Sequence, residues 1–538
     1  MHLVPARNGP RSHPRSRHRL PFLRLLACAT ALTAALAGCT TTVSGQGAAL
    51  PAPSGSGSAT SPSTEQPRAT FTDCSSIFNL NALKWPAGRL PKLSFTCARV
   101  SVPLDYADPA AGTISLELFK VHSTTNTSGN ALTVNPGGPG GSGVELAVQL
   151  ALQVSDRLLG SFDIVGFDPR GVGLSSPIAC ISDSEKDKLN AASPDILTQA
   201  GFVQAKELAK GVATGCQAKY GPALAQYNTV QTANDMDRIR QALGGQQLNY
   251  LGFSYGTELG SVYAHLFPHN VRVAVLDGAV DPLTDDITSF ADQLAGFEGA
   301  FDQFAADCAA RAACQVLSNP RQVVYDLVKQ ANTTPIKSSA PGETRSATGA
   351  IVLTGVLSAL YSRSEWSALG SALIAARGGD ARGLFALADQ YNQRSSDGTY
   401  SNISDANTTI ACNDSKPGPS DSTIEATAAK WAKAYPMFGP WAAPSLFNCQ
   451  QWQPKRTPIP LATAATPQKV LVIGNVHDPA TPYQGAKDLT KTMGNARLLT
   501  WDGQGHTSFL EGSSCIDKHV EDYLIDGTVP PAGTTCPR

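Results

Sequence analysis

The most constraining feature of this chain is a short turn in residues 252–256, Gly-Phe-Ser-Tyr-Gly. Residues 248–251 before it have the length and composition of a buried strand, and residues 257–265 after it suit a helix packed on a sheet. In that setting a G-x-S-x-G pattern predicts a turn so sharp that it needs glycine on both sides, with the Ser254 hydroxyl held clear of the backbone. Taken alone the pattern also fits an ordinary turn, so the role of Ser254 as a nucleophile depends on other segments.

A glycine-rich loop lies upstream of this turn. Residues 131–134 resemble a short strand, and residues 135–143, NPGGPGGSG, follow it. Glycines leave backbone N–H groups bare and able to approach a ligand. We expect the N–H group of Gly138, or of a glycine beside it, and that of Tyr255, the residue after Ser254, to form an oxyanion hole. A flexible linker is the other interpretation, but the prolines within the loop stiffen it.

Two late strand-like segments each lead into a residue that would complete a serine triad. The apolar run 469–474 is followed by Asp478, and the run 497–501 is followed by His506. In a triad the histidine takes the proton from the serine, and the carboxylate orients the histidine. The order Ser254, Asp478, His506 is the order used when a nucleophile elbow is present.

Neighbouring residues have other predicted roles. His477 lies on the same loop as Asp478, so we do not expect it to be the base. Thr481 lies three residues after Asp478, and its hydroxyl either donates to the carboxylate or only fills the loop. Residues 162–175 contain the segment DPRGVGLS, in which we expect Arg170 to be structural rather than catalytic.

Together these segments resemble one family, the actinobacterial tripeptidyl-aminopeptidase-like serine hydrolases. They are relatives of prolyl aminopeptidase and include mycobacterial cell-envelope serine protease and carboxylesterase lipoproteins. The resemblance covers about residues 71–538. It implies the α/β-hydrolase fold, a mostly parallel sheet with helices on both faces. One departure is Asn135-Pro136, where prolyl aminopeptidases carry histidine, which weakens any expectation of proline selectivity.

The pattern along the chain agrees with this fold. Strand-like and helical runs alternate between about residues 95 and 282, which predicts a largely parallel sheet. Residues 283–434 are rich in alanine and in helical patterns, including 366–391, and are too long for a loop. We expect residues 71–282 and 435–538 to form the core, and 283–434 to form a large helical cap inserted after strand six.

The resemblance implies an aminopeptidase that releases short peptides from free N-termini through an acyl-enzyme. Such an enzyme needs a carboxylate for the substrate ammonium, and the candidates are Asp414 and Glu258, although either is equally compatible with a solvated position. A carboxylesterase or lipase acting on cell-envelope esters is the alternative. We expect no metal and no organic cofactor, and the near-zero net charge of −1 gives no attraction to nucleic acid. The oligomeric state is left open.

The N-terminus predicts export. Arginines precede an apolar stretch that ends in Leu36-Ala37-Gly38-Cys39, which resembles a bacterial lipobox with Cys39 as the acylated residue. We therefore expect a lipoprotein signal peptide over residues 1–39 and anchoring in the cell membrane on its extracytoplasmic face. An ordinary secretory peptide is the alternative. Residues 40–70 lack bulky apolar side chains and are expected to be a flexible tether.

Ten of the 12 cysteines remain after Cys28 and Cys39 are set aside, and an even number on an exported chain suggests disulfides. Their spacings match no zinc pattern. Sequence alone leaves the connectivity open. We expect neighbours to pair: Cys74–Cys97, Cys180–Cys216, Cys308–Cys314, Cys412–Cys449 and Cys515–Cys536.

Overall fold

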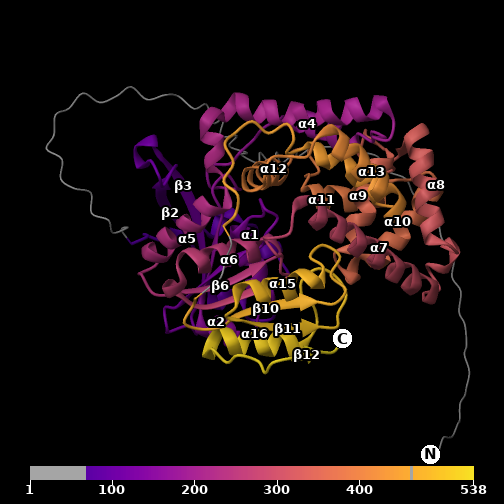
Figure 1. Ribbon diagram of the computed structural model, residues 1–538. Helices are drawn as coiled ribbons and strands as arrows, with labels where there is room; N and C mark the ends of the chain where they lie inside the picture. The colour runs from indigo at the N-terminus through magenta and orange to yellow at the C-terminus, as the bar shows by residue number, and fades with distance from the viewer. Residues whose placement is uncertain (1–67, 461–464) are drawn as a thin grey trace, which may run out of the picture. The chain divides into compact units, whose positions relative to one another are not determined.

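The computed structural model describes residues 68–460 and 465–538. The predicted signal peptide, Cys39 and nearly all of the predicted tether lie outside these residues. Within them, a 10-stranded sheet forms the centre of the fold (Figure 1). In spatial order its strands are β1 (Thr72–Asp73), β2 (Leu93–Pro103), β3 (Thr113–Ser123), β5 (Asp163–Phe167), β4 (Ala131–Asn135), β6 (Leu248–Phe253), β7 (Val271–Asp277), β10 (Val470–Asn475), β11 (Ala496–Trp501) and β12 (Thr535–Cys536).

The sheet is mostly parallel, as predicted. Strands β1, β2, β3 and β5 pair antiparallel, and every pair from β5 to β12 is parallel. In a parallel sheet the carboxyl ends of the strands meet at one edge, where ligands bind. The loops that follow β4, β6, β7, β10 and β11 are therefore gathered at that edge.

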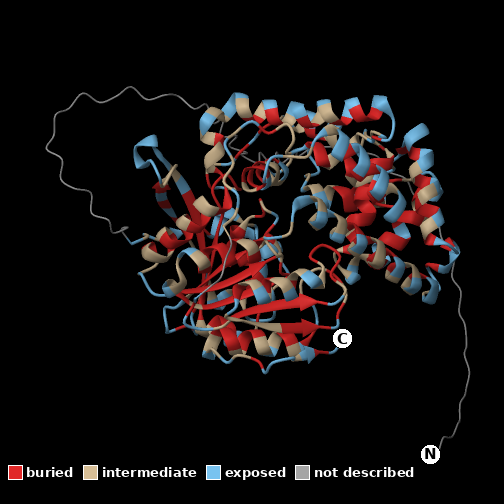
Figure 2. Cartoon of the chain, viewed as in Figure 1, coloured by how far each residue is buried: buried red, intermediate tan, exposed pale blue. Residues whose placement is uncertain are grey.

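Helices cover both faces of the sheet, because successive strand residues point to opposite sides. In β10, Leu471 and Ile473 pack in one core and Val470 and Val472 in the other, and Figure 2 shows the central strands buried. The helices of the first face are α1 (Gly143–Gln153), α2 (Asp156–Ser161) and α16 (Ser514–Asp526). Those of the second are α5 (Thr229–Ala242), α6 (Tyr255–Leu266) and α15 (Tyr483–Met493).

Helices follow β7, which is the sixth strand along the chain when the two-residue β1 is left out. They are α7 (Asp286–Ala310), α8 (Pro320–Thr333), α9 (Gly349–Leu360), α10 (Trp366–Arg377), α11 (Arg382–Asn392), α12 (Ile403–Asp414), α13 (Asp421–Ala434) and α14 (Gly439–Ala442), with a small ladder of β8 (Ile336–Lys337) and β9 (Ser346–Ala347). Most share one hydrophobic core separate from those of the sheet. The helical pattern over 366–391 forms two helices, α10 and α11, separated at Gly378-Gly379, where Gly379 has φ +89°.

The cap core also takes in segments from outside residues 283–434. Helices α3 (Asp183–Ala191) and α4 (Gln199–Tyr220) precede the nucleophile strand, yet Phe202 and Ala205 of α4 pack in that core. Phe202 meets Phe447 edge to face at 4.9 Å, and Phe438 is fully buried there. The expected boundaries at 282 and 435 therefore do not coincide with the packing.

All five predicted disulfides are present, including Cys412–Cys449 and Cys515–Cys536. The ligand atoms of Cys515, His519 and Cys536 lie close enough together to suggest a metal site, but the two sulfurs are already bonded to each other. None of the described helices combines the length and apolar character needed to cross a membrane.

Candidate active site

Ser254 lies at the turn between β6 and α6, with φ 54° and ψ −127°. This conformation is unusual for a residue with a side chain. A Cβ on Gly252 would lie 2.4 Å from the carbonyl oxygen of Gly256, so glycine is required there. The Ser254 N–H donates to the carbonyl of Asp277 at 2.9 Å, which holds the elbow against the end of β7. The turn predicted from residues 252–256 is thus a strand-turn-helix junction that presents a serine at the carboxyl edge.

The glycine-rich loop lies directly against this elbow. A Cβ on Gly137 would lie 2.9 Å from both Ser254 Cβ and Tyr255 N. Within the described chain, neither the Gly138 N–H nor the Tyr255 N–H donates a hydrogen bond. Tyr255 begins α6, where N–H groups have no helical partner. The glycine-rich loop therefore lies against Ser254, and the N–H groups of Gly138 and Tyr255 are free to bind an oxyanion.

The DPRGVGLS segment supports that loop. The Asp168 carboxylate accepts hydrogen bonds from the Ser142 hydroxyl at 2.6 Å, the Val144 N–H at 3.2 Å and the Leu174 N–H at 2.7 Å. Arg170 is completely buried and pairs with Asp235 through two nitrogens. These contacts are structural.

Asp478 and His506 meet as the sequence predicts. His506 Nδ1 lies 2.9 Å from Asp478 Oδ1 and 3.1 Å from Oδ2. The carboxylate also accepts the N–H groups of Ala480, Thr481 and Thr507, and the Thr481 hydroxyl at 3.0 Å. Asp478 is only 3% exposed, so these donors replace water around a buried charge. The carboxylate and the imidazole ring are firmly oriented.

The serine and the histidine are close but not hydrogen-bonded to each other in the part of the chain that the structure describes. They are brought together through the end of β7: Ser254 bonds to Asp277, and a Cβ on the next residue, Gly278, would lie 3.4 Å from His506 Cε1. Catalytic hydrogen bonds are often longer in a free enzyme and tighten when substrate binds. The two loops adjoin at the end of β7, which is the arrangement that a serine triad requires.

The electrostatic environment of His506 favours its charged form. Burial disfavours an imidazolium, but the charge and hydrogen bond of Asp478, with a further contribution from Asp277, raise the pKa of His506 above its ordinary value. Burial raises the pKa of Asp277 to about 7, and Asp478 adds to that effect. A histidine in this setting is suited to accept the proton of Ser254 and to hold it as an ion.

The cap reaches the base directly. The backbone N–H of His506 donates to the Tyr361 carbonyl at 2.7 Å. The Tyr361 ring lies edge-on to the imidazole, with centroids 5.4 Å apart. Phe297 of α7 and Tyr391 of α11 lie against the other sides of Tyr361. One wall of the space around His506 is therefore aromatic.

Glu258 and Asp414, the two predicted ammonium ligands, lie near each other and near the elbow. Ser254 and Glu258 are partly exposed, whereas the residues between them are buried. Burial raises the pKa of Glu258 to about 8, with Asp414 and Asp286 adding to it. Burial raises the pKa of Asp414 to about 7. This is a carboxylate pair with few compensating charges.

The two carboxylates differ in their partners. Asp414 accepts the Thr229 N–H at 2.9 Å and the Thr229 hydroxyl at 2.7 Å, and Thr229 is also hydrogen-bonded to the Tyr255 hydroxyl. The Glu258 carboxylate has neither a hydrogen bond nor an ion pair to any described residue. Glu258 is therefore the freer of the two to meet a ligand, and Asp414 is tied to the elbow.

The remaining sequence predictions have plain outcomes. His477 is turned away from Asp478 and contacts Gln303 at 3.1 Å and Asp502 at 3.5 Å. Asp277 and Tyr361 were not among the predicted site residues. Asp277 has a sequence signal, an acid at the carboxyl end of a strand, whereas Tyr361 has none because it reaches the site only through packing of the cap.

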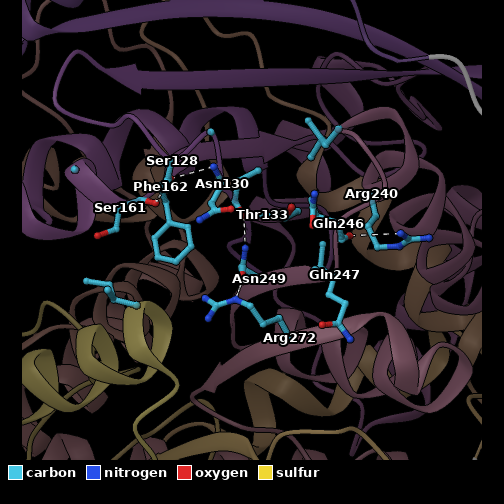
Figure 3. Close-up of a pocket in the computed structure, with 16 residues that line it drawn as sticks. Ser128, Asn130, Thr133, Ser161, Phe162, Arg240, Gln246, Gln247, Asn249 and Arg272 are labelled. Atoms are coloured by element: carbon cyan, nitrogen blue, oxygen red, sulfur yellow. Dashed lines mark hydrogen bonds between the residues drawn. The ribbon is translucent and has the colours of Figure 1, made fainter.

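A separate cavity of about 430 Å³ lies at the opposite edge of the sheet (Figure 3). It is lined by residues at the amino ends of β4, β6 and β7, among them Asn249 and Arg272. The Arg272 guanidinium donates to Asn249 and to the Leu524 carbonyl. Because Ser254 follows the carboxyl end of β6, this cavity is not the site of the triad.

Comparison with known proteins agrees with the site. Residues 435–536 match the family model described as TAP-like protein. Serine protease Hip1 of Mycobacterium tuberculosis is 38% identical over 468 residues, 84% of this chain and 88% of that protein. Carboxylesterase B of the same organism is 38% identical over 455 residues, 82% and 86% of the two chains. Tripeptidyl aminopeptidase of Streptomyces lividans is 33% identical over 476 residues, 87% and 86%. The chain belongs to the tripeptidyl-aminopeptidase-like family of α/β-hydrolases and is a serine hydrolase.

Proposed function

We propose that this serine hydrolase is an aminopeptidase that releases short peptides from free N-termini through an acyl-enzyme. Ser254 attacks the scissile carbonyl while His506 takes its proton, and Asp478 stabilises the imidazolium. The N–H groups of Gly138 and Tyr255 bind the oxyanion of the tetrahedral intermediate. His506 then returns the proton to the leaving amine, and water releases the acyl group by the same steps.

The observation that carries the substrate class is the Glu258 carboxylate, one helical turn after the nucleophile. It is partly exposed and unpaired among the described residues, and the nearby Asp414 adds to the rise of its pKa. A partly buried carboxylate without a cation nearby is costly, and an incoming ammonium reduces that cost. A peptide with a free N-terminus brings such an ammonium to a fixed distance from the scissile bond.

A short peptide anilide tests this proposal in free and N-acetylated forms. Acetylation removes the ammonium, and losing a charge-assisted contact of about 1.5–3 kcal/mol lowers kcat/KM roughly 10- to 150-fold. We expect Glu258→Gln to remove most of the preference for the free peptide. Short-chain esters remain substrates for both proteins, since the triad does not distinguish an ester from an amide.

The control is Ser254→Ala, which we expect to abolish both activities and labelling by a fluorophosphonate probe while the thermal unfolding curve stays unchanged. Persistent labelling would mean another nucleophile. If the wild type cleaves acetylated and free peptides equally, or cleaves only esters, the enzyme is a carboxylesterase. The aromatic wall formed around Tyr361 would then contact the acyl chain.

We also propose that the enzyme is exported and lipid-anchored through Cys39. This rests on the lipobox-like residues 36–39 and the polar segment after them. Two acyl chains, at about 0.8 kcal/mol per buried CH₂, hold a protein stably on a membrane. Cys39→Ala should move the protein from the membrane fraction to the soluble fraction. An unchanged distribution, with no acyl mass on the mature N-terminal peptide, would refute lipidation.

A further inference from the structure

Asp277 contacts the segments of both the nucleophile and the base. It is the last residue of β7 and is 0% exposed. Its carbonyl accepts the Ser254 N–H at 2.9 Å. Its carboxylate Oδ2 accepts the N–H groups of Ser508 at 3.1 Å and Phe509 at 2.7 Å, the second and third residues after His506. One residue thus joins two loops that are about 250 positions apart in the chain.

The second carboxylate oxygen has no such role. Asp277 Oδ1 is buried and has no hydrogen-bond partner among the described residues. Leaving a buried carboxylate oxygen unpaired is costly, whereas an amide would accept the same two N–H groups without a charge. Holding the loop therefore does not by itself account for a carboxyl group at this position.

Compared with an amide, the Asp277 carboxyl group adds a negative charge near the His506 imidazole. The charged groups that act on His506 are Asp478, which is hydrogen-bonded to it, Asp277, which is bonded to its loop, and Glu511 on that same loop. The Tyr361 ring covers it from the cap, and Asp517, which accepts the Leu510 N–H, acts on Glu511. Of these, the Asp277 carboxylate is completely buried and bonded to the His506 loop, so its ionisation is felt with little screening.

We propose that Asp277 is a positioning residue that holds the Ser254 elbow and the His506 loop in register and places a second negative charge behind the imidazole. The inference rests on the proposed triad, in which His506 becomes an imidazolium. Well below pH 7 the carboxyl group is protonated and only positions the loops. As the pH rises through 7, it ionises and stabilises the imidazolium that forms when Ser254 attacks.

The test compares Asp277→Asn with Asp277→Leu, using p-nitrophenyl butyrate so that the result is independent of peptide recognition. Asparagine keeps an acceptor for the two N–H groups but removes the charge. We expect the acid limb of its kcat/KM profile to move to lower pH by about half a unit to one unit, because His506 loses a stabilising charge. Leucine removes the acceptor as well, and kcat should fall about 10- to 100-fold with KM little changed.

The matched control is Asp163→Asn, a buried carboxylate at the start of β5 that bonds to His122 and Asn126. We expect its pH profile to coincide with that of the wild type. An unchanged acid limb in Asp277→Asn, or an unchanged kcat in Asp277→Leu, overturns the proposal. If Ser254→Ala is inactive while both Asp277 variants behave as wild type, only this inference fails. If Ser254→Ala stays active, the triad itself fails.

A measurement on the wild type covers the case in which a variant does not fold. With ¹³C-labelled histidine, and His506 assigned by its loss in His506→Gln, the imidazole signal is followed by NMR from pH 5 to 9. Coupled groups titrate in more than one step, so we expect a biphasic curve for His506. A curve with a single step overturns the proposal.

Discussion

At the scale of single residues, the site is built on carboxylates with different numbers of partners. Asp478 is surrounded by donors and serves as a fixed anion for His506. Asp277 and Asp414 are partly satisfied, and Glu258 has no partner among the described residues. The partner count separates the roles, because a saturated carboxylate orients a neighbour whereas an unsaturated one is available to a ligand or a proton.

Thr481 supplies two of the donors to Asp478, its N–H and its hydroxyl. Thr481→Val keeps the shape and the N–H but removes the hydroxyl. Losing one hydrogen bond of about 1 kcal/mol should lower kcat about 3- to 10-fold with KM unchanged, whereas Thr481→Ser should retain activity. Steady-state kinetics on an ester decides this. Full activity in Thr481→Val would mean that Thr481 only fills the loop.

In the proposed binding mode, the Glu258 and Asp414 pair makes peptide binding depend on pH. Their pKa values are raised to about 8 and about 7, so near pH 6 both are largely protonated and do not attract an ammonium. As the pH rises towards 8 they ionise, and KM for a free peptide should fall. Above about pH 8 the peptide amine loses its own proton and KM should rise again. An acetylated peptide should show no such minimum when KM is measured from pH 5.5 to 9.

At the scale of elements, the cap helps to hold His506 in position as well as packing against it. The chain leaves α9 at Tyr361, whose carbonyl binds the His506 N–H while its ring lies edge-on to the imidazole. Figure 1 shows the loop after β11 reaching towards the cap helices. The position of His506 is thus set from two sides, by the sheet through Asp277 and by the cap through Tyr361.

Tyr361→Ala removes a partly buried ring that lies between Phe297, Tyr391 and His506. The loss of packing should let the imidazole leave its position, so kcat on a short-chain ester should fall about 10-fold or more. Tyr361→Phe keeps the ring and should retain most activity. A fluorophosphonate labelling rate gives the same comparison without turnover. Equal rates for Ala and wild type would show that the cap acts only in substrate selection.

At the scale of the whole molecule, the acidic side chains with raised pKa values lower the stability of the folded protein. A carboxyl group whose pKa is raised in the folded state keeps its proton there at a pH where the unfolded chain has released it. The folded state then binds more protons, so stability falls as the pH rises from the unfolded pKa to the folded one. For Glu258 this window runs from about 4.5 to about 8.

Glu258→Gln removes that cost because glutamine does not ionise. The gain at pH 8 should be roughly 1–3 kcal/mol after allowance for the partial exposure of Glu258, which raises Tm by about 1–4 °C. At pH 4.5 the variant and the wild type should unfold at the same temperature. Calorimetry at the two pH values checks this. A variant less stable at pH 8 would mean that the carboxylate makes a stabilising contact in the folded protein.

The parts of the fold and of the site that the sequence predicts are those set by residues close together in the chain. The elbow at 252–256 and the glycine-rich loop are local, because glycine and proline restrict the backbone where they stand. The alternation of strands and helices is also a local pattern, and it predicts a parallel sheet. Because such a sheet brings the carboxyl ends of its strands together, the order Ser254, Asp478, His506 predicts that these residues meet. The five disulfides predicted by pairing neighbouring cysteines are also confirmed.

What only the tertiary structure decided are the contacts between surfaces from distant segments. Phe202 joins the cap core from before the nucleophile, and Tyr361 reaches His506 from the end of a cap helix. Which of Glu258 and Asp414 is free depends on Thr229, which no local pattern links to either. Side-chain periodicity predicts that one face of a helix or strand is buried. It does not predict which element packs against that face, because packing depends on the fit of complete surfaces. The sequence by itself therefore determined which residues can form the catalytic site, and the packing of the cap decided which side chains surround His506.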